Sequence, residues 1–130
     1  MNRKIGYVSL IVPSYDEAKD YYTRALGFTL SEDTDLGDGK RWIVINPGQG
    51  EGTGLVLAEA KTDEEKAAVG KQGAGRVWLF LHTDDFKRDH WRFQANGVRF
   101  LEQPREEPYG TVAVFEDRYG NKWDLLELKP

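Results

Sequence analysis

The residues of this chain that could carry chemistry are few. There is no cysteine, so thiol nucleophiles, disulfides and cysteine-bound zinc are excluded, and only two histidines are present. His82 ends an apolar run just before Thr83-Asp84-Asp85, where an imidazole can act as a general base or bond to local backbone. The local role is the favoured interpretation. His90 falls between Phe86 and Phe93 at helical spacing, which favours packing against a sheet over metal binding.

Other chemical motifs are weak. The serines lack the surroundings of a hydrolase nucleophile, and the glycine-rich turns do not lead from a strand into a helix as a phosphate loop does. The segment 105–110 is dense in functional groups, so Glu107 is a candidate base and Tyr109 a candidate for closing over a ligand. The alternative is that these adjacent charges are simply solvated.

The composition restricts the class of protein. A chain of 130 residues with 39% hydrophobic side chains suits one compact domain and argues against disorder. Its 18 basic and 22 acidic residues give a net charge of −4, which argues against nucleic acid or an anionic membrane as the main partner. No apolar run approaches the roughly 18–20 residues of a membrane helix, and residues 1–5 lack the core of a signal peptide. We expect a soluble, cytoplasmic protein.

Hydrophobic periodicity, glycines and prolines divide the chain into strands and helices. Strands are expected at 4–12, 28–32, 41–46, 54–59, 76–82, 98–101, 111–115 and 122–128. One helix is expected to begin at Tyr15 and another to span Asp85–Asn96, with Ser14 and Asp84 as their N-caps. The charged segment 61–75 is interpreted as a linker that holds one short helix behind a capping box.

These elements repeat. The order of strand, helix, glycine and three strands occurs twice, with Gly27 and Gly97 ending the two long helices. The repeat predicts an α+β protein of two tandem βαβββ modules, about residues 4–60 and 76–128, within a single domain. Neither module alone has enough core to be stable, so the two are expected to pack together.

Five short motifs occur in the order of a known family: Tyr7–Val12, Ala18–Tyr22, Leu26–Phe28, Asp117–Asn121 and Trp123–Glu127. They span most of the chain, from about residue 5 to residue 128. In this order and spacing the chain resembles the vicinal oxygen chelate superfamily, which includes glyoxalase I, extradiol dioxygenases and bleomycin-resistance proteins. The resemblance implies curved mixed sheets around a central cavity, helices on the outside, and a homodimer.

Enzymes of this superfamily hold a divalent metal at four strand positions, which fall here on Tyr7, Val56, Arg76 and Asp124. Val56 has no lone pair to donate, and Arg76 is a permanent cation. Moving the fifth-strand register by two residues places Trp78 there, which is no better as a ligand. One carboxylate does not make a tight site, so we expect no metal and no other cofactor.

The resemblance also places Arg76 and Asp124 on strands whose ligands converge. Asp124 lies inside an apolar run, where a carboxylate is costly to bury unless it is paired. One hypothesis is that the Arg76 guanidinium takes the place of the metal and bonds to Asp124, with the Tyr7 hydroxyl nearby. The alternative is that Arg76 points into solvent while Asp124 caps a turn.

Strand alternation would then place Trp78 and Phe80 on the same face as Arg76, opposite Tyr7 and Ser9. A cavity lined by aromatic rings and one cation suits a small organic anion or a flat aromatic compound. The alternative is that these rings fill the core.

Three functions are therefore open. The first is a metal-free binding protein for a small organic molecule, similar to bleomycin-resistance proteins. The second is a lyase or dioxygenase whose metal ligands have moved to positions such as His82, Glu59 or Glu107. The third is a metal-free enzyme in which Asp124 or His82 transfers a proton and Arg76 stabilises an oxyanion. The missing ligands favour the first and the third, and in each case the expected partner is a small molecule.

Overall fold

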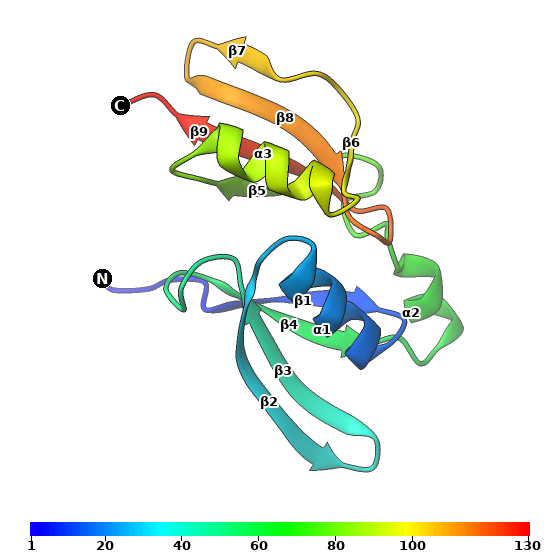
Figure 1. The fold of residues 1–130 in the computed structure, drawn as a ribbon. Helices are drawn as coiled ribbons and strands as arrows, with labels where there is room; N and C mark the ends of the chain where they lie inside the picture. The colour runs from blue at the N-terminus through cyan, green and yellow to red at the C-terminus, as the bar shows by residue number, and fades with distance from the viewer. The chain divides into compact units, whose positions relative to one another are not determined.

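The computed structural model describes residues 1–130, which form three helices and nine strands. The chain divides into two compact units, residues 1–68 and 69–130. Each unit holds one mixed sheet and one ten-residue helix packed on that sheet (Figure 1). The predicted α+β class is confirmed.

The first unit is built on a four-stranded sheet in the order β1-β4-β3-β2. Strand β1 (Tyr7–Val12) pairs in parallel with β4 (Gly54–Glu59), and β4 pairs antiparallel with β3 (Lys40–Asn46). The edge strand is β2 (Thr29–Gly37), and helix α1 (Tyr15–Arg24) connects β1 to β2.

The core of this unit lies between α1 and one face of the sheet. Alternate strand residues and the inner residues of the helix have no exposed surface there: Leu10, Val12, Ala18, Tyr22, Ile43 and Ile45. Each such side chain of the size of leucine contributes about 1.5–3 kcal/mol by burial. Because successive strand side chains point to opposite faces, Tyr7, Ser9 and Ile11 face away from the helix.

The second unit repeats this plan. It consists of β5 (Val77–His82), α3 (Phe86–Ala95), β6 (Arg99–Phe100), β7 (Arg105–Glu107), β8 (Gly110–Glu116) and β9 (Lys122–Leu128). Strand β5 pairs in parallel with β9, β9 pairs antiparallel with β8, and the short β6 and β7 both pair with β8. In both units the first strand therefore lies parallel to the last, as the predicted repeat implies, but the second unit has one strand more than predicted, β7.

The hairpin of β2 and β3 is longer than the sequence suggests. The expected strand 28–32 extends to Gly37, although every residue of β2 is exposed. A tight turn at Asp38 and Gly39, with φ of 54° and 78°, replaces the expected loop. Backbone pairing with β3, rather than burial, makes this segment a strand.

The starts of the two long helices also differ from the expectation. Asp85, and not Asp84, is the N-cap of α3, and its side chain accepts the Arg88 N–H at 3.0 Å. Ser14 makes no side-chain cap bond. Instead the N–H of the first residue of each helix donates to a glutamate of the last strand of the same unit: Tyr15 to Glu59 Oε2 at 3.0 Å, and Phe86 to Glu127 Oε1 at 2.7 Å.

The segment after β4 contains the expected short helix, α2 (Asp63–Ala68). Its capping box is confirmed, because the Glu65 N–H donates to Thr62 Oγ1 at 3.1 Å and Glu65 Oε1 accepts the N–H groups of Lys61 and Thr62. None of the three helices is long and apolar enough to cross a membrane.

The turn before β9 is held by a buried carboxyl group. Asp117 is 3% exposed and accepts hydrogen bonds from the Tyr119 N–H, from the N–H and side chain of Asn121, and from Trp123 Nε1 at 3.1 Å. The Trp123 ring stacks on Phe115 at 5.8 Å in the centre of the core. The motif Asp117–Asn121 therefore holds the turn that leads into β9, and its role is structural rather than ligand binding.

Replacing this carboxyl group should destabilise the protein strongly. We expect Asp117→Ala to lower the free energy of unfolding by about 3 kcal/mol, because several buried donors lose their acceptor. The measurement is urea unfolding followed by circular dichroism. Asp20→Ala, at an exposed carboxylate of α1, is the control and should change stability by less than about 0.5 kcal/mol. Equal stability of the two variants would contradict this assignment.

Candidate functional site

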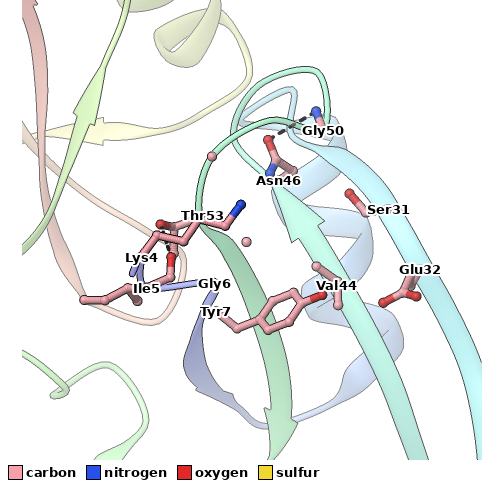
Figure 2. Close-up of a pocket in the computed structure, with 12 residues that line it drawn as sticks. Lys4, Ile5, Gly6, Tyr7, Ser31, Glu32, Val44, Asn46, Gly50 and Thr53 are labelled. Carbon is pink, nitrogen blue, oxygen red and sulfur yellow. Dashed lines mark hydrogen bonds between the residues drawn. The ribbon is translucent and has the colours of Figure 1, made fainter. Parts of the chain in front are cut away.

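A cavity of about 530 Å³ lies on the face of the first sheet that points away from α1 (Figure 2). We call it the Tyr7 cavity. Its walls come from residues 4–7, from Ser31 and Glu32 of β2, from Val44 and Asn46 of β3, and from the glycine-rich loop before β4. This volume is within the range of about 300–1,000 Å³ that is usual for small-molecule sites.

The position of the Tyr7 ring depends on the glycine opposite it. Tyr7 pairs with Gly54 across the parallel β1–β4 ladder. A Cβ atom on Gly54 would lie 3.3 Å from Tyr7 Cδ1 and 2.9 Å from Val44 Cγ1. Only glycine at position 54 therefore lets the Tyr7 ring lie against β4. In this position 54% of Tyr7 stays exposed toward the cavity.

A second aromatic side chain supports Tyr7 from β3. The rings of Tyr7 and Trp42 meet edge to face, with centroids 5.5 Å apart and planes at 83°. Trp42 is fixed in turn, because its Nε1 donates to Glu32 Oε2 at 2.6 Å. The cavity thus presents a supported aromatic surface. The sequence interpretation missed Trp42 and Glu32, although Trp42, Val44 and Asn46 alternate along their strand.

Some polar groups of the Tyr7 cavity already make hydrogen bonds within the protein. Asn46 Oδ1 accepts the N–H groups of Gly48 and Gly50, and Thr53 Oγ1 donates to the Ile5 carbonyl at 2.7 Å. The Tyr7 hydroxyl and the Lys4 ammonium make no such bond and are available to a ligand. A ring with a hydroxyl and an ammonium group nearby can bind an aromatic molecule that carries hydrogen-bond acceptors.

Ser9, which was predicted to share this site, lines a different cavity. That second cavity lies at the far end of the same sheet face and also includes Ile11. The two cavities share no lining residue.

The predicted pair of Arg76 and Asp124 does not form. Arg76 is exposed and precedes β5, where its N–H donates to the Gly73 carbonyl at 3.0 Å. No hydrogen bond or ion pair joins it to Asp124, whose Oδ1 is buried without a partner. The solvent-facing alternative for Arg76 is correct. The hypothesis failed because the chain turns at Gly73 and the strand begins only after Arg76.

A register shift also changes the predicted arrangement of aromatic residues. The β5–β9 ladder slips between Val77 and Leu79, so simple alternation does not hold through Trp78. The Trp78 ring meets the edge of Trp123 at 6.3 Å. Phe80 pairs with Asp124 and is 62% exposed, so these two residues share the sheet face opposite α3.

Burial changes the acidity of Asp124. Loss of solvent raises the pKa of this carboxyl group above its ordinary value of 3.8, and the positive charge of Arg105 only partly opposes the shift. Arg105 itself is held by Glu102 and Glu107 at 3.0 and 2.7 Å.

The remaining candidates lie elsewhere on the second unit. His82 is exposed at the end of β5, and Tyr109 is 48% exposed beside β8. Glu107 is paired with Arg105. Catalytic roles for Asp124 and His82, and ligand binding by Tyr109, stay predictions. His90 packs between Phe86 and Phe100, as expected, and burial lowers its pKa.

The residues present do not fit the divalent metal of the resembled enzymes. Ser9 pairs with Val56 in the first unit as Phe80 pairs with Asp124 in the second. Tyr7 pairs with Gly54, two residues before Val56, and Val77 pairs with Lys122, two residues before Asp124, so the counterpart of Tyr7 is Val77 rather than Arg76. No group of three or more histidine, aspartate or glutamate side chains is placed to hold a metal ion. Tyrosine, tryptophan and valine cannot replace such ligands.

Comparison with known proteins places the chain in a family. The Glyoxalase/Bleomycin resistance protein/Dioxygenase superfamily matches residues 4–125. The chain belongs to this superfamily. It is 50% identical over 129 residues to an uncharacterized protein of Shewanella frigidimarina, covering 98% of this chain and 96% of that one.

The fold is also similar to that of solved structures. UcmS2 superposes with a TM-score of 0.83 and 27% identity, over 97% of this chain and 98% of that one. TnmS3, an antibiotic binding protein from Streptomyces sp. CB03234, superposes with a TM-score of 0.78 and 30% identity, over 98% of both chains.

The unpaired Asp124 predicts a specific dependence of stability on pH. Because its pKa is raised in the folded state, its contribution to stability is present at low pH and is lost as pH rises through that pKa. We expect Asp124→Asn to match the wild type below about pH 3.8 and to exceed it at pH 7 by about 1 kcal/mol, or about 4 °C in Tm.

Thermal melts of both proteins at a series of pH values measure this difference. Asp38→Asn, at an exposed turn carboxylate, is the matched control and should show no pH-dependent difference. A wild type that gains stability relative to Asp124→Asn toward pH 7 would contradict the burial argument.

Proposed function

We propose that the protein binds a small aromatic organic molecule in the Tyr7 cavity, without a metal ion. The observation that carries the proposal is the exposed Tyr7 ring, held between Gly54 and Trp42 in a cavity of about 530 Å³. Such a ring, with one hydroxyl and one ammonium group near it, suits stacking and edge contacts with a flat molecule. The similarity to TnmS3, an antibiotic binding protein, supports the binding of a small organic molecule.

The superfamily also contains dioxygenases, but the ligand set that metal chemistry needs is not matched here. Tyr7 and Val56 stand at two of the inherited positions, and neither Arg76 nor Trp78 supplies a ligand at a third. We therefore favour a binding protein over a metal-dependent lyase or dioxygenase. The homodimer implied by the resemblance stays a prediction.

The aromatic surface can be tested by substitution. A panel of neutral compounds with two to four fused aromatic rings is screened by thermal shift, and the best compound is titrated by calorimetry. We expect Tyr7→Ala to weaken its binding about tenfold or more, because a buried aromatic contact is lost. Trp91→Ala, at a 70% exposed tryptophan of α3, is the control and should leave the affinity unchanged. Unchanged affinity in Tyr7→Ala would exclude this cavity.

Independence from metal gives a second test. Protein purified without chelator should carry no stoichiometric Mn, Fe, Ni or Zn by mass spectrometry. Dialysis against EDTA should leave the Tm and the affinity for the same aromatic compound unchanged, because no ligand set is lost. A stoichiometric metal whose removal abolishes binding would overturn the proposal.

A further inference from the structure

The sheet of the first unit opens into a fork. Strands β3 and β4 pair only at Val44–Val56 and Ile45–Leu55, and beyond this point the β2–β3 hairpin bends away from β4 (Figure 1). A cavity of about 470 Å³ lies at this opening. We call it the fork cavity; it is the one that includes Ser9.

The inner surface of the fork cavity is largely apolar. Ile11 and Ala58 line it from the paired strands, Leu36 lines it from the hairpin, and Tyr15 lines it from the start of α1. Leu36 is 60% exposed, so this apolar surface is open to a ligand.

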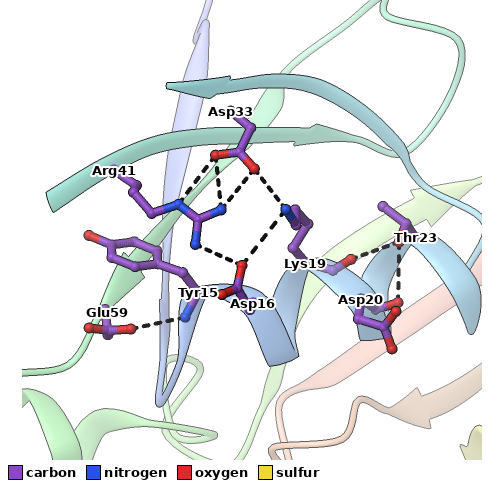
Figure 3. A network of polar contacts seen from close by, with 8 residues as sticks. All are labelled: Tyr15, Asp16, Lys19, Asp20, Thr23, Asp33, Arg41 and Glu59. Carbon is purple, nitrogen blue, oxygen red and sulfur yellow. Dashed lines mark hydrogen bonds and ion pairs between the residues drawn. The ribbon is translucent and has the colours of Figure 1, made fainter. Parts of the chain in front are cut away.

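A network of ion pairs joins Arg41, in one wall of the fork cavity, to neighbouring side chains. The Arg41 guanidinium donates to Asp16 at 2.7 Å and to both oxygens of Asp33 at 2.8 and 3.0 Å, while Lys19 also binds Asp33 at 2.7 Å (Figure 3). These bonds hold the pKa of Asp33 below its ordinary value. The guanidinium lies 5.6 Å from the centre of the Tyr15 ring. Arg41 is thus committed within the protein and is not the group that selects a ligand.

The carboxylates of the fork cavity also accept hydrogen bonds from within the protein. Glu59 Oε2 accepts the Tyr15 N–H at the positive end of the α1 dipole. Glu65 Oε1 accepts two backbone N–H groups, which lower the pKa of that carboxyl group. Both carboxylates therefore have their charge stabilised by backbone donors.

The lysines remain. Lys40 begins β3 on one side of the fork and makes no ion pair, and Lys61 follows β4 on the other side with only a 3.4 Å contact to Glu59. From this distribution we propose that the fork cavity binds a small organic acid. Its apolar body lies on Ile11, Ala58 and the Tyr15 ring, and its acid group lies between Lys40 and Lys61. This site does not depend on ligand binding in the Tyr7 cavity, since the two share no residue.

A matched pair of probes tests the proposal. Naphthalene-1-acetate and naphthalene-1-acetamide have the same apolar body and differ in charge. We expect the acid to bind about tenfold more tightly than the amide in low salt, because only the acid makes charge-assisted bonds to the lysines. The advantage should shrink as salt is added, since both lysines are exposed to solvent. Calorimetric titration measures both affinities.

Variants locate the site. Lys40→Ala with Lys61→Ala should reduce the affinity for the acid to that for the amide and leave the amide unchanged. Lys40→Arg with Lys61→Arg should keep the advantage, which separates charge from structural damage. Lys71→Ala, at an exposed lysine that lines neither cavity, is the matched control and should bind both probes like the wild type. Thermal melts check that every variant is folded.

Failure of this proposal is distinguishable from failure of the proposed function. Absence of binding, equal affinities for acid and amide, or an advantage that survives the double alanine variant would overturn the acid site. So would loss of the advantage in Lys4→Ala, a variant of the lysine that lines the Tyr7 cavity, because the acid would then occupy that cavity. The proposed function fails on a separate result, namely an unchanged affinity of Tyr7→Ala for the aromatic compound selected in the screen.

Discussion

The first N–H group of each long helix donates a hydrogen bond to a glutamate on the last strand of the same unit. Glu59 accepts the N–H of Tyr15, and Glu127 accepts that of Phe86. Each carboxylate satisfies a donor that has no partner inside its helix and meets the positive end of the helix dipole. Since that last strand also pairs with the first, one bond fixes the helix over the parallel pair. The helix then covers one sheet face, and alternation leaves Tyr7 on the other.

Much of the fold could be predicted because apolar runs bounded by glycine or proline mark buried strands. The expected bounds of β4 and β9 are confirmed, as is the start of α1 at Tyr15. The polar edge strand β2 and the short β7 could not be predicted in the same way. Their residues are mostly exposed, and backbone pairing with a neighbour defines them. Hydrophobic patterning carries no information about a strand that buries neither face.

The site was less predictable than the fold, because it depends on register. Tyr7 follows from its place on the first strand, but Trp42 reaches it only through the pairing of β3 with β4. On β5, one slip between Val77 and Leu79 separates Trp78 from the alternation that includes Phe80. A spacing rule cannot show such a slip, since the same residue types fit either register. The Arg76 hypothesis failed for another reason, because the chain turns at Gly73 and β5 begins only after Arg76.

The internal repeat shows which positions correspond in the two units. Tyr7 stands where the resembled enzymes have a metal-binding histidine, and the corresponding place in the second unit is Val77, which pairs with Lys122 as Tyr7 pairs with Gly54. An imidazole holds a cation through a nitrogen lone pair, whereas a phenol or indole ring offers a large apolar face with one polar edge. At Tyr7 the exchange removes a ligand and adds aromatic surface. In the proposed function the Tyr7 ring contacts the organic molecule directly, and its hydroxyl supplies directionality that a purely apolar surface would lack.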